Sequence, residues 1–256
     1  MKFQTKDDDF GEVPVKTLLI VDDQADIREL LVELLAPLGL RILGSGSGNA
    51  AFVVVERDRP DFVLTDIRMG DGDGVELIER ISTLGPGRPE VAAMSGFADI
   101  TLAEVLDRGA VDLFDKPFDI QLISERIGHF ITPWADRWQE TGSEWPGAAR
   151  RLAFSGMPEA LASGAVAVGR GGIFAATSEE FAVGARIPLK LTLGADTWSM
   201  LAAVRWARTV DAPAFHAGIR LEVLDADPAT REVLRGLALA RDAKAFVPIG
   251  ARLGRT

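Results

Sequence analysis

The 256-residue chain contains no cysteine, and this absence excludes disulfide bonds, thiolate nucleophiles and cysteine-ligated metal sites together. Its two histidines, His129 and His216, lie outside any metal-binding sequence pattern. Apolar runs stay short of the roughly 18 residues that a membrane-spanning helix needs. The acidic amino terminus, MKFQTKDDDFGE, lacks the apolar segment of a secretory signal. We therefore expect a cytoplasmic protein of bacterial type, without membrane insertion and with a disordered tail over residues 1–14.

Charge is unevenly distributed between the two halves of the chain. Residues 1–144 carry 14 Lys and Arg against 28 Asp and Glu, whereas residues 145–256 carry 14 against 10. The ordinary explanation is two domains with different surfaces. The sharper hypothesis is that the basic half meets an anionic partner or docks on the acidic half.

Strand-like and helical patterns alternate between Val15 and Ile131. The strand-like runs are continuously apolar, which is typical of a parallel sheet covered by helices on both faces. Five such strand–helix units predict an open α/β fold. We expect strands at 17–21, 41–45, 62–66, 91–95 and 111–114, and helices at 27–40, from the N-cap Asn49 to about Arg57, at 75–82, at 99–108 and from Asp119 onward.

Polar residues follow four of these strands: Asp22 with Asp23, Asp66, Ser95 and Lys116. Because the carboxyl ends of parallel strands meet at one edge of a sheet, we expect these side chains to lie together. Carboxylates there are hard oxygen ligands of the kind that Mg²⁺ takes. With Mg²⁺ neutralising an incoming phosphate, Asp66 could attack phosphorus and form an acyl phosphate. Lys116 would pair with the phosphoryl oxygens, and Ser95 would donate a hydrogen bond to one of them.

The segments IVDDQADIRELL, LTDIRMGDGDGVELIERI, MSGFAD and LFDKPFD resemble, in order and spacing, the receiver domain of response regulators. The resemblance covers residues 15–131 and implies a flavodoxin-like α/β fold, a five-stranded parallel sheet with the βα unit repeated five times. It also implies a role for each site residue. Asp66 is the implied phosphoacceptor, and Asp22, Asp23, Asp66 and the backbone carbonyl of Arg68 are the implied Mg²⁺ ligands. Ser95 is the implied switch hydroxyl and Phe114 the implied aromatic switch. Lys116 matches the family's invariant-type lysine, and Pro117 follows it through a bond that is often cis.

Two positions depart from the receiver pattern. Gly70 follows Met69 where proline is common, which loosens the loop beside the acceptor without removing a ligand. Gly96 follows Ser95 where alanine is common, and we expect this to alter access of the phosphate.

A connector is predicted after the last receiver helix. Thr132 and Pro133 are typical of a helix start, so PWADRWQE is expected to form a short helix with Trp134 and Trp138 four residues apart. We assign residues 132–146 to a helical connector and linker. The tryptophans are expected to pack in a core or between domains, and the Ile, Phe and Trp stripe of the connector helices could support a homodimer.

Residues 147–245 have a different texture, with short strands separated by Gly, Asp and Pro, which predicts a small antiparallel barrel. A helix with Asp227 as its N-cap and Pro228 as its first residue closes this half. The segments GAVAVGRGGIFAATS, RIPLKLTLG, LAAVRWART and GIRLEVLD resemble a PilZ domain. The resemblance implies an all-β PilZ-like barrel with a C-terminal helix, followed by a tail at 246–256.

PilZ domains commonly bind cyclic di-GMP through an RxxxR segment and a D/N-x-S-x-x-G segment. Here Ala167 and Gly169 occupy the Asp/Asn and Ser positions, and Arg150 and Arg151 have no arginine four residues away. These losses remove base readout and part of the phosphate contact, so cyclic di-GMP binding is not expected. A residual site would use Arg150, Arg151, Arg170 and Gly172.

These patterns together predict a two-component response regulator whose Asp66 is phosphorylated by a histidine kinase or a phosphotransfer protein. Its degenerate PilZ domain would contact an unknown output protein. The sequence shows no helix-turn-helix or basic recognition helix, so we expect no DNA binding. Catalysis is expected to be limited to the domain's own phosphorylation and dephosphorylation. Two alternatives stay open: a cyclic di-GMP receptor gated by phosphorylation, and a phosphorelay sink with a PilZ docking scaffold.

Overall fold

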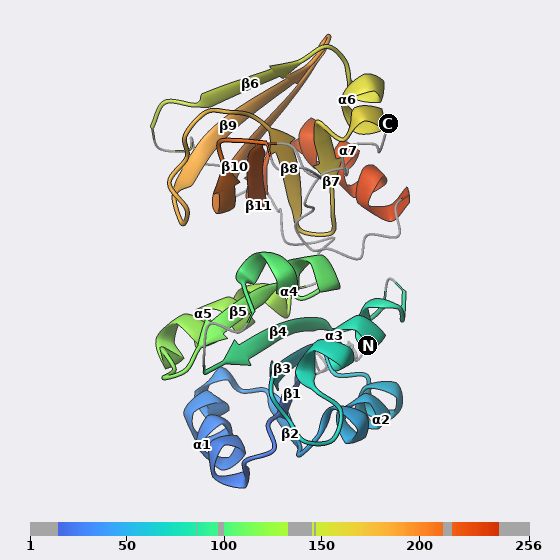
Figure 1. The fold of residues 1–256 in the computed structure, drawn as a ribbon, viewed down its shortest axis with the longest axis vertical. Coiled ribbons are helices and arrows are strands. Elements are labelled where there is room, and N and C mark those ends of the chain that lie inside the picture. Colours follow the sequence, from blue (N-terminus) through green and yellow to red (C-terminus); the bar gives the residue numbers. More distant parts are fainter. Residues whose placement is uncertain are drawn as a thin grey trace, which may run out of the picture.

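The computed structural model describes residues 15–85, 87–96, 100–132, 145, 147–211 and 217–240. Within them the chain forms two sheets, one in each half (Figure 1). The predicted connector helix, with Trp134 and Trp138, lies outside the described residues, as does His216. No helix within these ranges combines the length and the apolarity that crossing a membrane requires.

The first half alternates strands and helices along the chain. Its strands are parallel and adjoin in the order β2-β1-β3-β4-β5, which confirms the predicted five-stranded parallel sheet. The elements are β1 (Thr17–Val21), α1 (Ala25–Leu35), the 3-10 helix η1 (Ala36–Leu38), β2 (Arg41–Ser45), α2 (Gly48–Asp58), β3 (Phe62–Asp66), α3 (Gly74–Ser82), β4 (Glu90–Ser95), α4 (Leu102–Arg108), β5 (Asp112–Asp115) and α5 (Ile120–Phe130).

Both faces of this sheet are buried, as the continuous apolar strands predict. Leu18 and Ile20 point into one cluster, which α1 and α5 cover, and Leu19 and Val21 point into the other, which α2 and α3 cover. Each fully buried side chain of this size stabilises the fold by about 1.5–3 kcal/mol. The two clusters hold the strands in register, so their carboxyl ends meet at one edge.

Several predicted helix boundaries were wrong in the first half; α4, for example, starts at Leu102 and not at residue 99. Asn49 does not cap α2: the Ser47 hydroxyl accepts from the Ala50 amide at 3.2 Å, and Asn49 lies inside the helix, where its amide donates to Asp71. The first helix stops at Leu35 and gives way to η1, because Pro37 lacks the amide hydrogen that another helical turn needs.

The second half is a curled, mixed six-stranded sheet with two helices. Its strands adjoin in the order β6-β9-β10-β11-β8-β7, around one apolar cluster that includes Leu191, Val204 and Leu234. The elements are β6 (Arg150–Phe154), α6 (Met157–Ser163), β7 (Val166–Val168), β8 (Gly172–Ala176), β9 (Arg186–Leu193), β10 (Asp196–Arg208), β11 (Gly218–Ala226) and α7 (Pro228–Ala240).

The expectation of a purely antiparallel barrel was wrong, because β6 pairs with β9 in parallel. Parallel neighbours need a long crossover, and here α6, β7 and β8 lie within that connection. The helix α6 was not predicted at all. The closing helix α7 starts as expected, with an Asp227 carboxylate oxygen accepting from the Thr230 amide at 3.0 Å.

Candidate functional site

Three carboxylates meet at the carboxyl edge of the first sheet. Asp22 and Asp23 follow β1, Asp66 ends the neighbouring β3, and carboxylate oxygens of all three lie within 4.8 Å of one another. Asp22 and Asp66 are buried, whereas Asp23 is exposed. The structure thus brings together the acidic residues that the sequence singled out, and leaves one of them open to solvent.

Lys116 reaches this cluster from the end of β5. Its Nζ lies 2.8 Å from Asp22 Oδ2 and 3.1 Å from Asp66 Oδ1. Burial acts to lower the pKa of Lys116, but the hydrogen bond with Asp22 and the charges of both carboxylates outweigh it and raise that pKa. The lysine is therefore a fixed positive charge at the site. The peptide bond from Lys116 to Pro117 is cis.

Asp66 is held in a fixed orientation. Its Oδ1 accepts from the Ile67 amide at 3.0 Å as well as from Lys116. Burial raises the pKa of Asp66, and the charge and hydrogen bond of Lys116 offset this only in part. An ionised carboxylate here is consequently held at some cost and would be stabilised by added positive charge.

The two predicted switch residues lie on β4, which adjoins β3, and on β5, which adjoins β4. Ser95 is the last residue of β4, is buried, and its carbonyl accepts from the Lys116 amide at 2.8 Å. Phe114 lies on β5 and packs in the apolar cluster under α5. Both thus lie between the edge that carries Asp66 and the α4–β5–α5 side of the domain.

The donor set fits a hard divalent cation such as Mg²⁺. Three carboxylates offer oxygen ligands within a space of a few ångström, and oxygen is the ligand that this ion prefers. The carbonyl of Arg68, two residues after Asp66, stays a predicted further ligand. The exposed Arg68 side chain lines a hollow of about 520 Å³ with Met69 and Ile100, next to the loop that follows Asp66.

Two residues that support the site were not predicted. Arg28 of α1 donates from Nη1 to the Asp22 carbonyl at 2.6 Å and so fixes the backbone of the acidic pair. Gly74 starts α3 where a Cβ atom would lie 1.9 Å from the Asp66 carbonyl oxygen. Its only sequence signal was its place directly after the helix-capping Asp73.

The candidate ligand residues of the second half do not share a common set of contacts. Arg170, in the turn between β7 and β8, is buried and pairs with Glu90 of the first half at 2.6 Å. Arg150, on β6, pairs instead with Glu179 and stacks on Phe181. Arg151 is exposed on β6, and Gly172 starts β8. A nucleotide site built from these residues stays a prediction.

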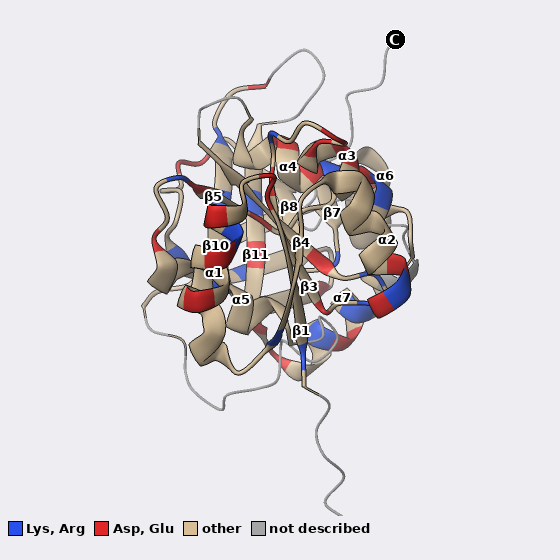
Figure 2. Ribbon diagram, turned by 90° about the horizontal axis from the view of Figure 1, so that it is seen from below, with Lys and Arg blue, Asp and Glu red and all other residues tan. Residues whose placement is uncertain are grey.

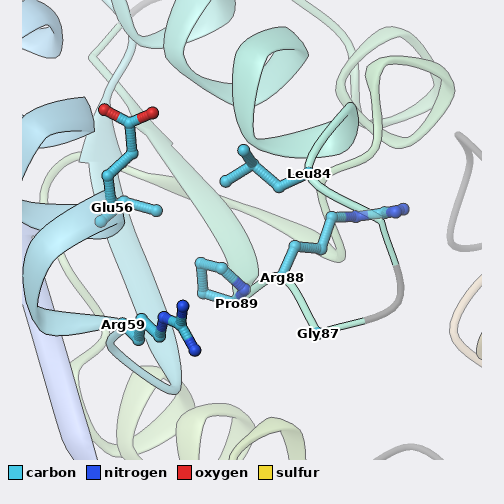
Figure 3. Close-up of a pocket in the computed structure, with 7 residues that line it drawn as sticks. Glu56, Arg59, Leu84, Gly87, Arg88 and Pro89 are labelled. Carbon is cyan, nitrogen blue, oxygen red and sulfur yellow. The ribbon is translucent and has the colours of Figure 1, made fainter.

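A second pocket, of about 460 Å³, opens at the opposite edge of the first sheet (Figure 3). It lies between the loops that precede β3 and β4, away from Asp66. Figure 3 shows the guanidinium groups of Arg59 and Arg88 pointing in different directions around Pro89. Its polar groups do not converge, so this pocket lacks the arrangement that is typical of a ligand site.

Comparison with known proteins identifies the family of the first half. Residues 18–128 match the family described as response regulator receiver domain. Sporulation initiation phosphotransferase F of Bacillus subtilis (strain 168) is 32% identical over 115 residues, which cover 44% of this chain and 92% of that protein. A solved structure of a putative response regulator from Chloroflexus aurantiacus J-10-fl aligns with a TM-score of 0.43 at 26% identity, covering 46% of this chain and 98% of that one.

Other relatives are longer. The transcriptional regulatory protein ZraR of Salmonella typhimurium is 32% identical over 132 residues, which are 51% of this chain but 29% of that protein. The chain therefore spans less than a third of that relative's length.

Proposed function

This chain belongs to the response regulators through the receiver domain at residues 18–128, and on that premise we propose that Asp66 is its phosphoacceptor. The observation that carries the proposal is the cluster of Asp22, Asp23 and Asp66 with Lys116 in contact with two of them. The phosphoryl donor is a phosphohistidine of a kinase or phosphotransfer protein.

In the transfer, an Asp66 carboxylate oxygen attacks the donor's phosphorus. The oxygen–phosphorus bond forms as the phosphorus–nitrogen bond to the donor imidazole breaks, and the nitrogen keeps the electron pair. Lys116 lies 3.1 Å from Asp66 and can follow the new phosphoryl oxygens as a compact charge. Ser95, at the end of the neighbouring strand, donates its hydroxyl to one of those oxygens.

Asp22, Asp23, Asp66 and the Arg68 carbonyl would hold Mg²⁺. When bound, the ion neutralises charge on the phosphoryl group and on the carboxylates around it. Arg28 and the Gln24 amide keep Asp22 oriented for this task, since they bond its carbonyl and its Oδ1. We further propose that catalysis by the chain is limited to its own phosphorylation and dephosphorylation.

Intact mass spectrometry after incubation with acetyl phosphate and Mg²⁺ tests the acceptor. The wild type should gain one phosphoryl group, and Asp66→Asn should gain none. Asp115→Asn is the matched control, because Asp115 is an exposed carboxylate at the end of β5 on the same edge of the sheet. Equal labelling of Asp66→Asn and the wild type would disprove the assignment.

We propose that the second half is a PilZ-like output domain that acts through protein contacts. A curled sheet closed by α7 supports this, as does the PilZ-like segment pattern. Arg170, one of the candidate ligand arginines, is buried against Glu90, which favours a protein contact over a nucleotide pocket. The output partner would be recognised by a surface that phosphorylation changes.

The gated cyclic di-GMP receptor is the second candidate. Calorimetric titration of the full chain with cyclic di-GMP tests it, with the double variant Arg150→Ala, Arg151→Ala as the matched comparison. Binding that the double variant abolishes would support the receptor, whereas absence of heat in both favours the protein-contact output. A relay sink would instead show fast transfer from a phosphotransfer protein without any change in contacts of the second half.

A further inference from the structure

The loop that joins β3 to α3, residues 67–73, carries the Arg68 carbonyl, a predicted Mg²⁺ ligand. The ends of this β3–α3 loop are tied together, because the Gly74 amide donates to the Ile67 carbonyl at 2.9 Å. On the side of α4 the loop borders the hollow of about 520 Å³. Support for the middle of the loop therefore has to come from its other side, where α2 lies.

Two glycines make the β3–α3 loop easy to deform. Gly70 stands where the receiver pattern commonly has proline, and Gly72 adopts a positive φ of 72°. A loop with glycine at these positions has more accessible backbone conformations than one that contains proline. Its folded geometry consequently depends on contacts from outside the loop.

The N-terminus of α2 supplies one such contact through its backbone. The first amides of a helix have no partner within the helix, and here the Gly48 amide donates to the Gly72 carbonyl at 3.0 Å. A Cβ atom on Gly48 would lie 2.4 Å from that carbonyl oxygen, so this approach requires glycine. The two glycine-rich stretches of the receiver, at 44–48 and 70–74, therefore meet backbone to backbone.

Asn49 adds a side-chain contact to the same loop. Its Nδ2 donates to Asp71 Oδ1 at 2.9 Å, while its Oδ1 accepts from Arg80 Nη1 of α3 at 2.9 Å. Arg80 is held in place in turn, since its guanidinium carbon lies 3.9 Å from the centre of the Phe52 ring. Because the oxygen of the Asn49 amide faces Arg80, its nitrogen faces Asp71. We call Asn49, Asp71, Arg80 and Phe52 the loop clamp.

The loop clamp differs from the exposed ion pairs around it. Figure 2 shows α2 and α3 on the same side of the receiver, with acidic and basic positions on both helices. Arg57 pairs with Asp58 at 2.6 Å at the other end of α2. Arg80 instead bonds an uncharged amide whose second group reaches the loop. An exposed ion pair contributes little by itself, so an effect of the clamp on the site would come from the position that it gives the loop.

We propose that Asn49 is a positioning residue for the Mg²⁺-assisted phosphorylation of Asp66, because it holds the β3–α3 loop in the conformation in which the Arg68 carbonyl serves as a ligand. The inference rests on the proposed acceptor function. Asn49 acts through Asp71 and the backbone of the loop, not by contact with the ion. Its loss leaves only a fraction of the molecules with a competent loop, and the apparent affinity for Mg²⁺ falls by that fraction.

Mg²⁺ titration of the full chain by isothermal calorimetry tests this. Asn49→Ala should weaken Mg²⁺ binding about fivefold, the value of one net hydrogen bond. The Mg²⁺ concentration that gives half the maximal rate of phosphorylation by acetyl phosphate should rise by the same factor. The rate at saturating Mg²⁺ should stay within about twofold of the wild type, because the bound ion selects the competent loop. Arg57→Gln is the matched control on α2 and should change neither quantity.

An exchange of the two side chains distinguishes positioning from a general effect on α2. The double variant Asn49→Asp, Asp71→Asn keeps one donor and one acceptor at the contact and leaves the net charge unchanged. The new carboxylate can still accept from Arg80. The double variant should therefore restore the Mg²⁺ affinity to within about twofold of the wild type. Should Asn49→Ala lose its fold, Arg80→Met takes its place in the titration, because it removes the partner that orients the amide.

The outcomes separate this inference from the acceptor function. A wild type that binds no Mg²⁺ and gains no phosphoryl group would overturn the acceptor function, and the inference with it. A wild type that binds Mg²⁺ and is phosphorylated, with the same Mg²⁺ affinity as Asn49→Ala and Arg57→Gln, would overturn the positioning role alone. A double variant that binds Mg²⁺ as weakly as Asn49→Ala would refute the hydrogen bond to Asp71 as its cause.

Discussion

Two clusters of buried charge in this protein differ in how their charges balance. At the receiver edge, three carboxylates lie within 4.8 Å, Lys116 pairs with two of them, and burial keeps the pKa of Asp66 raised. At the contact between the halves, where Glu222 of β11 meets Arg126 and His129 of α5, burial acts on Glu222 in the same direction. There, however, hydrogen bonding with His129 and the charges of Arg126 and Arg205 lower the pKa of Glu222 to about 2.

The difference shows that burial alone does not distinguish a reactive site from a structural one. Both clusters desolvate their carboxylates, and the supply of positive charge decides the sign of the shift. A cluster that is short of positive charge favours the binding of a metal cation. A balanced cluster stabilises the arrangement that brings its members together. The following predictions test this contrast, from the largest expected effect to the smallest.

Replacement of Glu222 by Gln should cost the most stability. It keeps the shape of the side chain but leaves the half-buried Arg126 and Arg205 with Asp112 as their remaining shared carboxylate. Removing one partner of a buried pair typically costs about 3–5 kcal/mol, and the remaining carboxylate places this variant at the lower end. The measurement is the shift of the urea unfolding midpoint. Glu179→Gln is the matched control, since it removes an exposed pair with Arg150 and should cost less than about 1 kcal/mol. Similar shifts for both variants would contradict a structural role for these charges between the halves.

Acid should weaken the balanced cluster in a defined pH range. The pKa of Glu222 falls from 4.5 to about 2 on folding, so its contribution to stability is complete above the unfolded pKa and is lost as pH falls through the folded pKa. The free energy of unfolding of the wild type should therefore drop more steeply between pH 4.5 and 2 than that of Glu222→Gln. Parallel pH profiles for the two proteins would show that Glu222 is not the responsible group.

Removal of the Lys116 charge beside Asp22 and Asp66 should slow phosphorylation more than it lowers the stability of the fold. Lys116→Met is expected to slow phosphorylation by acetyl phosphate about 100-fold, the usual cost of losing one preorganised donor to a developing charge. Lys190→Met, at an exposed position on β9, should leave the rate unchanged. The check is the initial rate of phosphoryl gain by mass spectrometry, and a less than twofold effect of Lys116→Met would remove the lysine from the mechanism.

Mg²⁺ should stabilise the protein through the reactive cluster. At about ten times its dissociation constant, an ion that binds only the folded form adds about 1.4 kcal/mol. Thermal unfolding with and without Mg²⁺ measures this. Asp23→Asn should abolish the gain, whereas Asp115→Asn should retain it. Equal gains in both variants would place the ion elsewhere.

The smallest expected effect is the change in stability caused by Asp66→Asn, which should be opposite in sign to that caused by Glu222→Gln. Without Mg²⁺, Asp66→Asn should raise the melting temperature slightly, because burial keeps the pKa of Asp66 raised and the substitution removes one of three crowded carboxylate charges. Glu222→Gln acts in the opposite direction. A lower melting temperature for Asp66→Asn than for the wild type would show that Lys116 already balances the reactive cluster.

Local pattern in the sequence predicted the strands of the receiver better than its helix caps, and it did not predict the strand pairing of the second half. The strands at 41–45 and 62–66 were predicted at their observed bounds, because continuous apolar runs between turn residues define buried strands. The cap at Ser47 was missed because serine and asparagine both cap helices, and only backbone geometry chooses between them. The parallel pairing of β6 with β9 was missed because alternation of residues along a strand does not specify its partner.

The sequence by itself determined that Asp22, Asp66 and Lys116 lie together, because parallel strands must bring their carboxyl ends to one edge, and each of these residues lies at the end of such a strand. Only the tertiary structure decided that the basic half docks on the acidic half, a possibility that the charge distribution had left open. Arg126 and Glu222 are 96 residues apart, and no local pattern marks either as a partner of the other. Their pairing depends on the burial of both when the second sheet lies against α5, which is a property of the assembled surfaces.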